Sequence, residues 1–223
     1  MASVSLVRQA GSGAGAALLA CVGEHGSAAH PWFGSEPLVS GPDSARNLAD
    51  AVHLLCALHG RQPGLVDLAA ARTVEPEARA WLNAGAGAMT AERNYLTRLA
   101  VAAGPVPGTP GGAASEAGVA AQRGALATLA QSDRRGCALG AALAFAADWI
   151  PIRALLDTAA RRLGLEPPPS RLGREEELRA VADAAADSPS AERALLFGAQ
   201  QLALQHRALW DLLEARREAR SGA

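Results

Sequence analysis

The most apolar stretch of the chain consists almost entirely of helix-forming residues. Residues 137–147 read CALGAALAFAA and contain no polar side chain apart from the thiol of Cys137. Alanine is the strongest helix former and is depleted in strands. Hydrophobic residues make up 49% of the chain but aromatic residues only 4%, and no alternating strand pattern follows residue 40. The sequence therefore predicts an all-α protein whose core consists of Ala, Leu and Val.

Helix start and stop signals divide the rest of the chain. The helices that they predict span residues 44–60, 73–103, 114–132, 133–163, 174–187 and 190–217, with a short helical turn at 65–71. Residues 1–42 are rich in Gly, Ser and Pro, so we expect an irregular N-terminal arm there. We expect a compact bundle of five or six helices forming one domain over residues 43–218, followed by a frayed tail at 219–223.

The overall charge disfavours one class of partner. The 21 basic residues, all of them arginine, stand against 22 acidic residues. Because no region is strongly basic, we expect no nucleic acid partner. Arg134 and Arg135 are interpreted as surface charges beside a helix rather than as an anion site.

The apolar run after residue 136 is too short to predict a membrane span. It covers 16 residues from Cys137 to Ile152 and includes Asp148 and Pro151, whereas a spanning helix needs roughly 20 apolar residues. Small residues one turn apart predict close packing against a neighbouring helix: Gly136, Gly140 and Ala144.

The cysteines and the N-terminal arm suggest several sites that we discount. Three widely spaced cysteines form neither a disulfide framework nor a zinc motif, and they fit a cytoplasmic protein. Leu18–Cys21 resembles a lipoprotein cleavage site, which leaves export or lipidation at Cys21 as an alternative, but the stretch from Arg8 to Leu18 is interrupted by polar residues and glycine. Residues 11–16 partly match a dinucleotide-binding glycine pattern without the later strands that it needs. His25 and His30 are expected to face solvent rather than bind a metal.

Asp148 stands alone beside the apolar run, and its neighbours predict that it points inward. The residues one turn away from it are all apolar: Ala144, Phe145, Ile152 and Leu155. The opposite face carries charges that are expected to be solvated: Arg153, Asp157 and Arg161. Pro151 frees the carbonyl group of Ala147 beside Asp148. Burying an unpaired carboxylate is costly, so Asp148 must be paired, protonated or hydrated.

Two further polar residues fall on apolar helix stripes, which gives Asp148 candidate partners. Glu92 and Tyr95 lie on one predicted helix and His206 on another, so the candidate pocket is Glu92, Tyr95, Asp148 and His206. Secondary candidates lie on other predicted helix faces: His59, Glu116, Arg123 and Glu192. The sequence does not determine whether these residues lie at one level of the bundle.

Three kinds of chemistry could explain such inward polar residues. A ferritin-like di-metal site needs Glu-x-x-His pairs, which the chain lacks, although two carboxylates and one His could hold a single ion. A small-molecule pocket could use His206 as a general base, and a haem variant would use His59 or His206 as an axial ligand. A structural network would pair Asp148 or Glu92 with Arg93, Arg123 or His206. The sequence does not determine which cofactor, if any, the chain binds.

Three segments resemble an uncharacterised family of helical proteins from GC-rich proteobacteria. They are Glu92–Leu96, Gly108–Gly111 with Ser115–Ala117, and Arg134–Gly140, and the resemblance covers roughly residues 44–165. It brings no function with it. The helical layout is also similar to ferritin-like and haem-oxygenase-like bundles, as a fold analogy only.

We therefore expect a non-catalytic structural or partner-binding module with a buried polar network. The partner could be a second copy of the chain. The alternative is a small-molecule-binding or metal-dependent bundle enzyme that uses the inward Glu, Asp and His.

Overall fold

The computed structural model describes residues 13–222, and these residues form α-helices and one 3-10 turn without a strand. The expectation of an all-α protein is confirmed, but the described residues form nine helices rather than five or six. Arg8 and the start of the glycine pattern at 11–16 lie outside the described residues.

The helices differ widely in length. The longest are α5 (Pro76–Ala102), α6 (Gly112–Ala130), α7 (Cys137–Arg162) and α9 (Pro189–Ser221). The shorter elements are α1 (Ala14–His25), η1 (Ser27–Ala29), α2 (Glu36–Val39), α3 (Ser44–His59), α4 (Leu65–Arg72) and α8 (Glu175–Ala185). Most predicted helices are present within a few residues of their expected bounds. α7 begins later than residue 133 because Gly136, at φ 92°, takes a left-handed conformation just before it.

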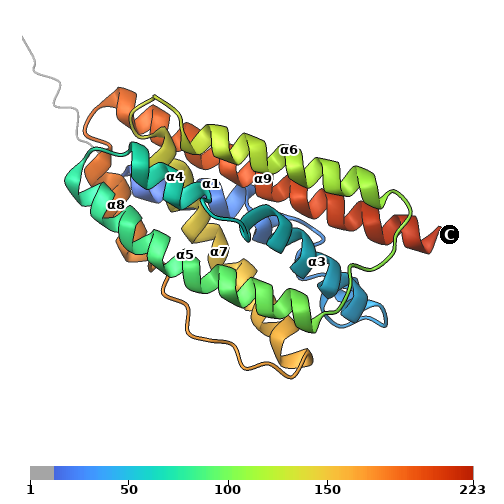
Figure 1. Cartoon of the computed structure of the whole chain (residues 1–223). Coiled ribbons are helices and arrows are strands. Elements are labelled where there is room, and N and C mark those ends of the chain that lie inside the picture. Colours follow the sequence, from blue (N-terminus) through green and yellow to red (C-terminus); the bar gives the residue numbers. More distant parts are fainter. Residues whose placement is uncertain (1–12, 223) are drawn as a thin grey trace, which may run out of the picture.

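Helix α7 lies at the centre of the fold. It contacts α1, α3, α4, α5, α6, α8 and η1, and its most extensive contact is with α9. In Figure 1, α6 and α9 run side by side along one side of the molecule, while α5 lies on the other side. The apolar run 137–147 is buried throughout, which is why a helix without a polar face can exist here.

Two glycines let α7 and α9 pack backbone against backbone. A Cβ atom on Gly140 would lie 2.0 Å from the carbonyl oxygen of Leu195, and one on Gly198 would lie 2.1 Å from that of Cys137. The predicted close approach along the Gly136–Gly140 ridge is confirmed. The two helices therefore pack closely because both lack side chains at the crossing.

The expectation of an irregular N-terminal arm is wrong for the described residues. α1 packs on α7, α8 and α9, and Leu18 and Leu38 are fully buried. Gly15 is a contact point rather than a flexible position, because a Cβ atom there would lie 2.5 Å from the carbonyl oxygen of Arg179. The sequence prediction failed because glycines that permit close packing look the same in a sequence as glycines of a loop.

The C-terminal tail also differs from the expectation. α9 continues to Ser221, so residues 219–221 are helical rather than frayed. Arg216 and Arg220 both bind Asp50 on α3, which holds the last turns of α9 against the fold.

One helix of the described residues, α7, is long and apolar enough to cross a membrane by length and composition. Of its most apolar window, 83% is buried inside the fold. A helix buried in a protein core can be equally long and apolar, so this property alone does not indicate a membrane span.

The close crossing of α7 and α9 leads to a stability prediction. Gly140→Ala should lower the free energy of unfolding by about 1–3 kcal/mol, because the new methyl group forces the helices apart. Gly87→Ala on α5, where a Cβ atom meets nothing within 4 Å, should instead stabilise by about 1 kcal/mol. Urea denaturation measures both, and equal stability of the two variants would contradict the packing described.

Candidate functional site

Asp148 is the centre of a buried polar cluster that joins three elements. Its side chain is 1% exposed. Oδ1 accepts a hydrogen bond from the backbone N–H of Ser27 at 2.8 Å, and Oδ2 accepts one from the Ser27 hydroxyl at 2.6 Å. Nδ1 of His206 also lies 2.6 Å from Oδ2. We call Ser27, Asp148 and His206 the Asp148 cluster; it confirms that Asp148 points inward, and it shows that Asp148 is paired.

Gly26 allows the chain to approach Asp148 this closely. A Cβ atom at Gly26 would lie 2.5 Å from Oδ1 of Asp148 and 2.5 Å from the carbonyl oxygen of Val22. A few residues later His30 is 3% exposed, and its Nε2 lies 2.9 Å from Asp211 on α9. The expectation that His30 faces solvent is therefore wrong. The segment after α1 is therefore bound to α7 through Ser27 and Asp148, and to α9 through His30 and Asp211.

His206 and His59 meet edge to face in the core, and one nitrogen of each ring is unpaired. Their ring centroids are 5.0 Å apart and nearly perpendicular, and Phe145 and Trp149 lie against His59 at 5.1 and 5.6 Å. Within the described residues, Nε2 of His59 and Nε2 of His206 have no hydrogen-bond partner. Burial, and then the neighbouring His206 and Arg93, hold the pKa of His59 well below its usual 6.5. His59 is therefore neutral in the fold at pH 7.

Glu92 belongs to a second buried cluster, which is built around an arginine. Arg153 donates to Oε1 of Glu92 at 2.7 Å, and the indole N–H of Trp149 donates to Oε2 at 3.1 Å. Arg153 also donates to Asp157 at 2.7 Å, and the hydroxyl of Tyr95 donates to the same carboxylate oxygen at 2.9 Å. We call Glu92, Tyr95, Trp149, Arg153 and Asp157 the Glu92 cluster.

Arg153 was expected to be solvated, and that expectation is wrong. Its side chain is 7% exposed, its guanidinium lies 4.3 Å from the centroid of the Tyr95 ring, and it also binds the carbonyl oxygen of Pro168. The segment after α7 thus covers a face of α7 that would otherwise meet solvent. Burial, and then the hydrogen bond to Asp157, raise the pKa of Tyr95 well above its usual value, so its hydroxyl stays protonated.

The four candidate pocket residues fall into two clusters rather than around one space. Asp148 and His206 belong to one cluster, Glu92 and Tyr95 to the other, and Trp149 lies between them through its contacts with His59 and Glu92. The carboxylates of Asp148 and Glu92 and the hydroxyl of Tyr95 all bind protein groups, whereas Nε2 of His206 has no partner among the described residues. None of five surface hollows of the described residues is lined by any of the four.

The secondary candidates do not join a common site. His59 meets His206 edge to face, but Glu116 is exposed and Glu192 is partly exposed. Arg123 donates to the carbonyl oxygen of Ala57 at 3.2 Å. Among the described residues no group of three or more His, Cys, Asp or Glu side chains is arranged to hold a metal ion.

Three ion pairs around two aspartates, Asp67 and Asp50, involve residues that the sequence did not connect. Arg93, a suggested partner for Asp148 or Glu92, instead binds Asp67, which also accepts the N–H of Gly64 at 2.8 Å. Asp50 is 1% exposed and binds both Arg216, at 2.8 Å, and Arg220.

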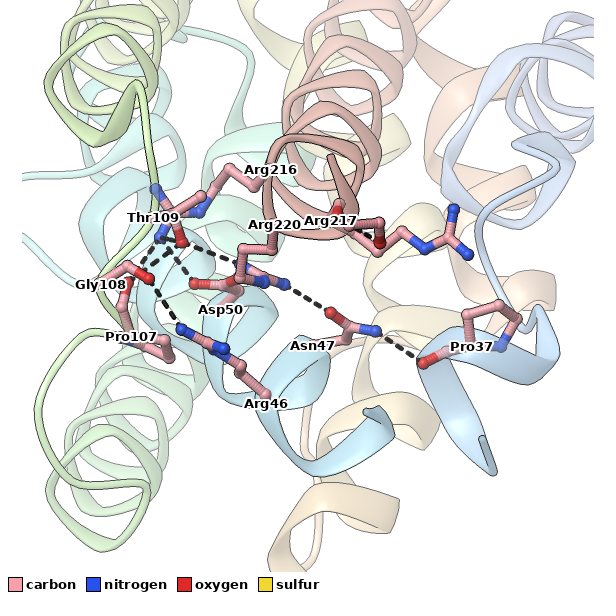
Figure 2. A network of polar contacts seen from close by, with 11 residues as sticks. Pro37, Arg46, Asn47, Asp50, Pro107, Gly108, Thr109, Arg216, Arg217 and Arg220 are labelled. Carbon is pink, nitrogen blue, oxygen red and sulfur yellow. Dashed lines mark hydrogen bonds and ion pairs between the residues drawn. The ribbon is translucent and has the colours of Figure 1, made fainter. Parts of the chain in front are cut away.

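Figure 2 shows how Asp50 and its two arginines hold the loop around Thr109 and the end of α9 together. The guanidinium of Arg220 also contacts Asn47 and Thr109, and Arg216 contacts the carbonyl oxygen of Pro107. We call Asn47, Asp50, Thr109, Arg216 and Arg220 the Asp50 cluster. The neighbouring Arg217 points away from it (Figure 2). The available signal was weak, because Asp50 lies on the side of its helix opposite Leu48 and Val52, and only Leu54, one turn later, marks that side as apolar.

Comparison with known proteins adds one result to this geometry. A model of a family of unknown function, DUF6975, matches residues 22–221. The chain belongs to this family. The match is wider than the expected 44–165 and includes every residue of the three clusters, so the DUF6975 region contains η1 and the end of α9. No curated protein and no solved structure matches the chain.

The low pKa of His59 leads to a prediction about acid stability. The pKa of His59 in the folded state lies below the unfolded value of 6.5. Its contribution to the free energy of unfolding is therefore complete above pH 6.5 and is lost as the pH falls toward the folded pKa. The loss reaches up to about 1.4 kcal/mol per pH unit. His59→Phe should flatten the fall in unfolding free energy below pH 6.5. Denaturation at several pH values tests this, with His53→Phe on the same helix as control. An unchanged slope in His59→Phe would contradict it.

The Asp50 cluster predicts a large effect of an isosteric change. Asp50→Asn should lower the free energy of unfolding by about 3–5 kcal/mol, because it leaves two buried guanidinium groups without their carboxylate. Hydrogen exchange should quicken at the amides of residues 216–221. Asp43→Asn, at an exposed position beside the same helix, should change neither. A denaturation midpoint of Asp50→Asn equal to that of the wild type would show that the ion pairs of Asp50 do not hold α9 against α3.

Proposed function

We propose that this chain is a non-catalytic helical module that binds a partner protein, and that its inward polar residues fix how the helices pack. One observation carries the proposal: the two inward carboxylates that could form a site are bound to other protein groups. Asp148 accepts three hydrogen bonds and Glu92 accepts two.

A catalytic acid or base needs a free lone pair or proton that faces bound substrate. Oδ2 of Asp148 is shared by Ser27 and His206, and both oxygens of Glu92 are bound. The free atoms near them are Nε2 of His59 and Nε2 of His206, and the packed rings of Phe145 and Trp149 adjoin them. A small molecule would have to displace these rings.

In a core made mainly of Ala and Leu, buried polar clusters restrict how the helices can pack. Apolar contacts of similar size allow many packings, whereas a charge that loses its buried partner costs several kcal/mol. A helix that slides by one turn would separate Glu92 from Arg153. The clusters thus favour one register, which suits a module that presents a fixed surface.

The proposal is tested with isosteric variants that remove charge from each cluster. Glu92→Gln and Asp148→Asn should each lower the free energy of unfolding by about 3–5 kcal/mol, while Glu116→Gln, at an exposed position, should leave it unchanged. Added Zn²⁺, Fe²⁺ or EDTA should not shift the melting temperature of the wild type. Variants that are more stable than the wild type and lose metal or ligand binding would support the enzyme alternative instead.

A further inference from the structure

A groove at the start of α9 is lined by arginines and by no carboxylate. It measures about 680 Å³ and lies between the turn before α7 and the first three turns of α9. The residues that line it are Arg134, Arg135, Ser188, Ser190, Ala191, Arg193, Ala194 and Phe197. We call this surface the arginine groove.

Two nearby acidic residues pair with Arg135 of the groove itself, while Glu192, between the lining residues Ala191 and Arg193, forms no ion pair among residues 13–222. Glu75 and Asp187 both bind Arg135, each at 2.6 Å. Asp133 lies 3.5 Å from Arg72. Among residues 13–222, no ion pair involves the two remaining arginines of the groove, Arg134 and Arg193, and both are exposed. Two free guanidinium groups beside the carboxylate of Glu192 leave the groove with net positive charge, on a chain whose net charge is −1.

Two exposed apolar side chains lie along α9 beyond the groove, with Gln200 and Gln201 between them. The guanidinium of Arg134 lies 5.7 Å from the centroid of the Phe197 ring, a cation–π contact that orients Arg134 beside the groove. Phe197 is 42% exposed, as is Leu204. These two residues are seven apart on one helix, so they lie on the same face. The surface thus offers two free guanidinium groups followed by two apolar side chains.

We infer that the arginine groove binds an acidic segment of a partner protein, with its carboxylates at Arg134 and Arg193 and an apolar side chain against Phe197. This inference rests on the proposed function. Charge complementarity selects the occupant, because guanidinium groups pair with carboxylates in fixed geometry. Nucleic acid fits less well, since its binding needs many phosphate contacts along a basic surface and the groove offers two free charges.

The test measures binding of a fluorescein-labelled peptide of four Glu-Glu-Leu repeats to the full chain by fluorescence anisotropy. The wild type should bind saturably with a Kd below about 100 μM, more weakly at high salt. Arg134→Glu with Arg193→Glu should weaken binding at least about tenfold. Phe197→Ala should weaken it severalfold. All these side chains are exposed, so the variants should melt like the wild type.

A control variant changes the net charge equally at a distance from the groove. Arg98→Glu with Arg161→Glu alters an exposed arginine of α5 and one at the opposite end of α7 from the groove, and it should bind the peptide within about twofold of the wild type. If both double variants bind the peptide equally well, or lose binding equally, the groove is not the binding site. That result would not contradict the proposal that the chain is a partner-binding module. No binding by the wild type would overturn the inference, whereas the proposed function is judged separately by Glu92→Gln and Asp148→Asn.

Two further measurements distinguish other occupants. The first is binding of a 20-nucleotide single strand. If it binds the wild type more tightly than the peptide does, and Arg134→Glu with Arg193→Glu abolishes that binding, the occupant of the groove is nucleic acid rather than an acidic segment. Sedimentation that shows a wild-type dimer dissociated by the same double variant would make the occupant a second copy of the chain. Either result overturns the inference, and a monomer that binds the peptide supports it.

Discussion

The carboxylate of Asp148 is the group on which the arrangement of this fold most depends. It lies on the most buried helix, and a charge there is tolerable only with full hydrogen bonding. Ser27 supplies two donors and His206 lies against the same carboxylate. The group therefore fixes α7, α9 and the turn after α1 with respect to one another. Without it, α1 and the turn after it would keep apolar packing, the Gly15–Asp183 hydrogen bond and the His30–Asp211 pair, but would lose their polar contact with α7.

The other two clusters act at different places along the same long helices. The Glu92 cluster joins α5 to α7 and to the segment that follows α7, and the Asp50 cluster joins α3 to the end of α9. Between them the packing relies on alanine and on glycine crossings such as Gly140 and Gly198. Small residues bring backbones close but specify register poorly. Directional charged contacts supply the specificity that small apolar side chains lack.

The sequence predicted more of the fold than of the site. The stripes of α5 and α9 and the inward direction of Glu92, Asp148 and His206 follow from helical periodicity, which local spacing determines. The pairing of Glu92 with Arg153 did not follow, because Arg153 lies on a face that only the later segment around Pro168 covers. Ser27 was missed for a similar reason: its role depends on a contact 121 residues away in the chain. Partner identity is a tertiary property that one helix does not encode.

The separations along the chain that these clusters bridge have a consequence for biosynthesis. Ser27 meets Asp148 across 121 residues, and Asp50 meets Arg216 and Arg220 across 166 and 170 residues. A ribosome produces Ser27 and Asp50 early, and α9, which carries His206 and both arginines, is the last of the described helices to emerge. Until α9 has been synthesised, the carboxylates on the earlier helices remain hydrated. Contacts of such long range also form slowly. Docking of α9 is then the event that completes the native state.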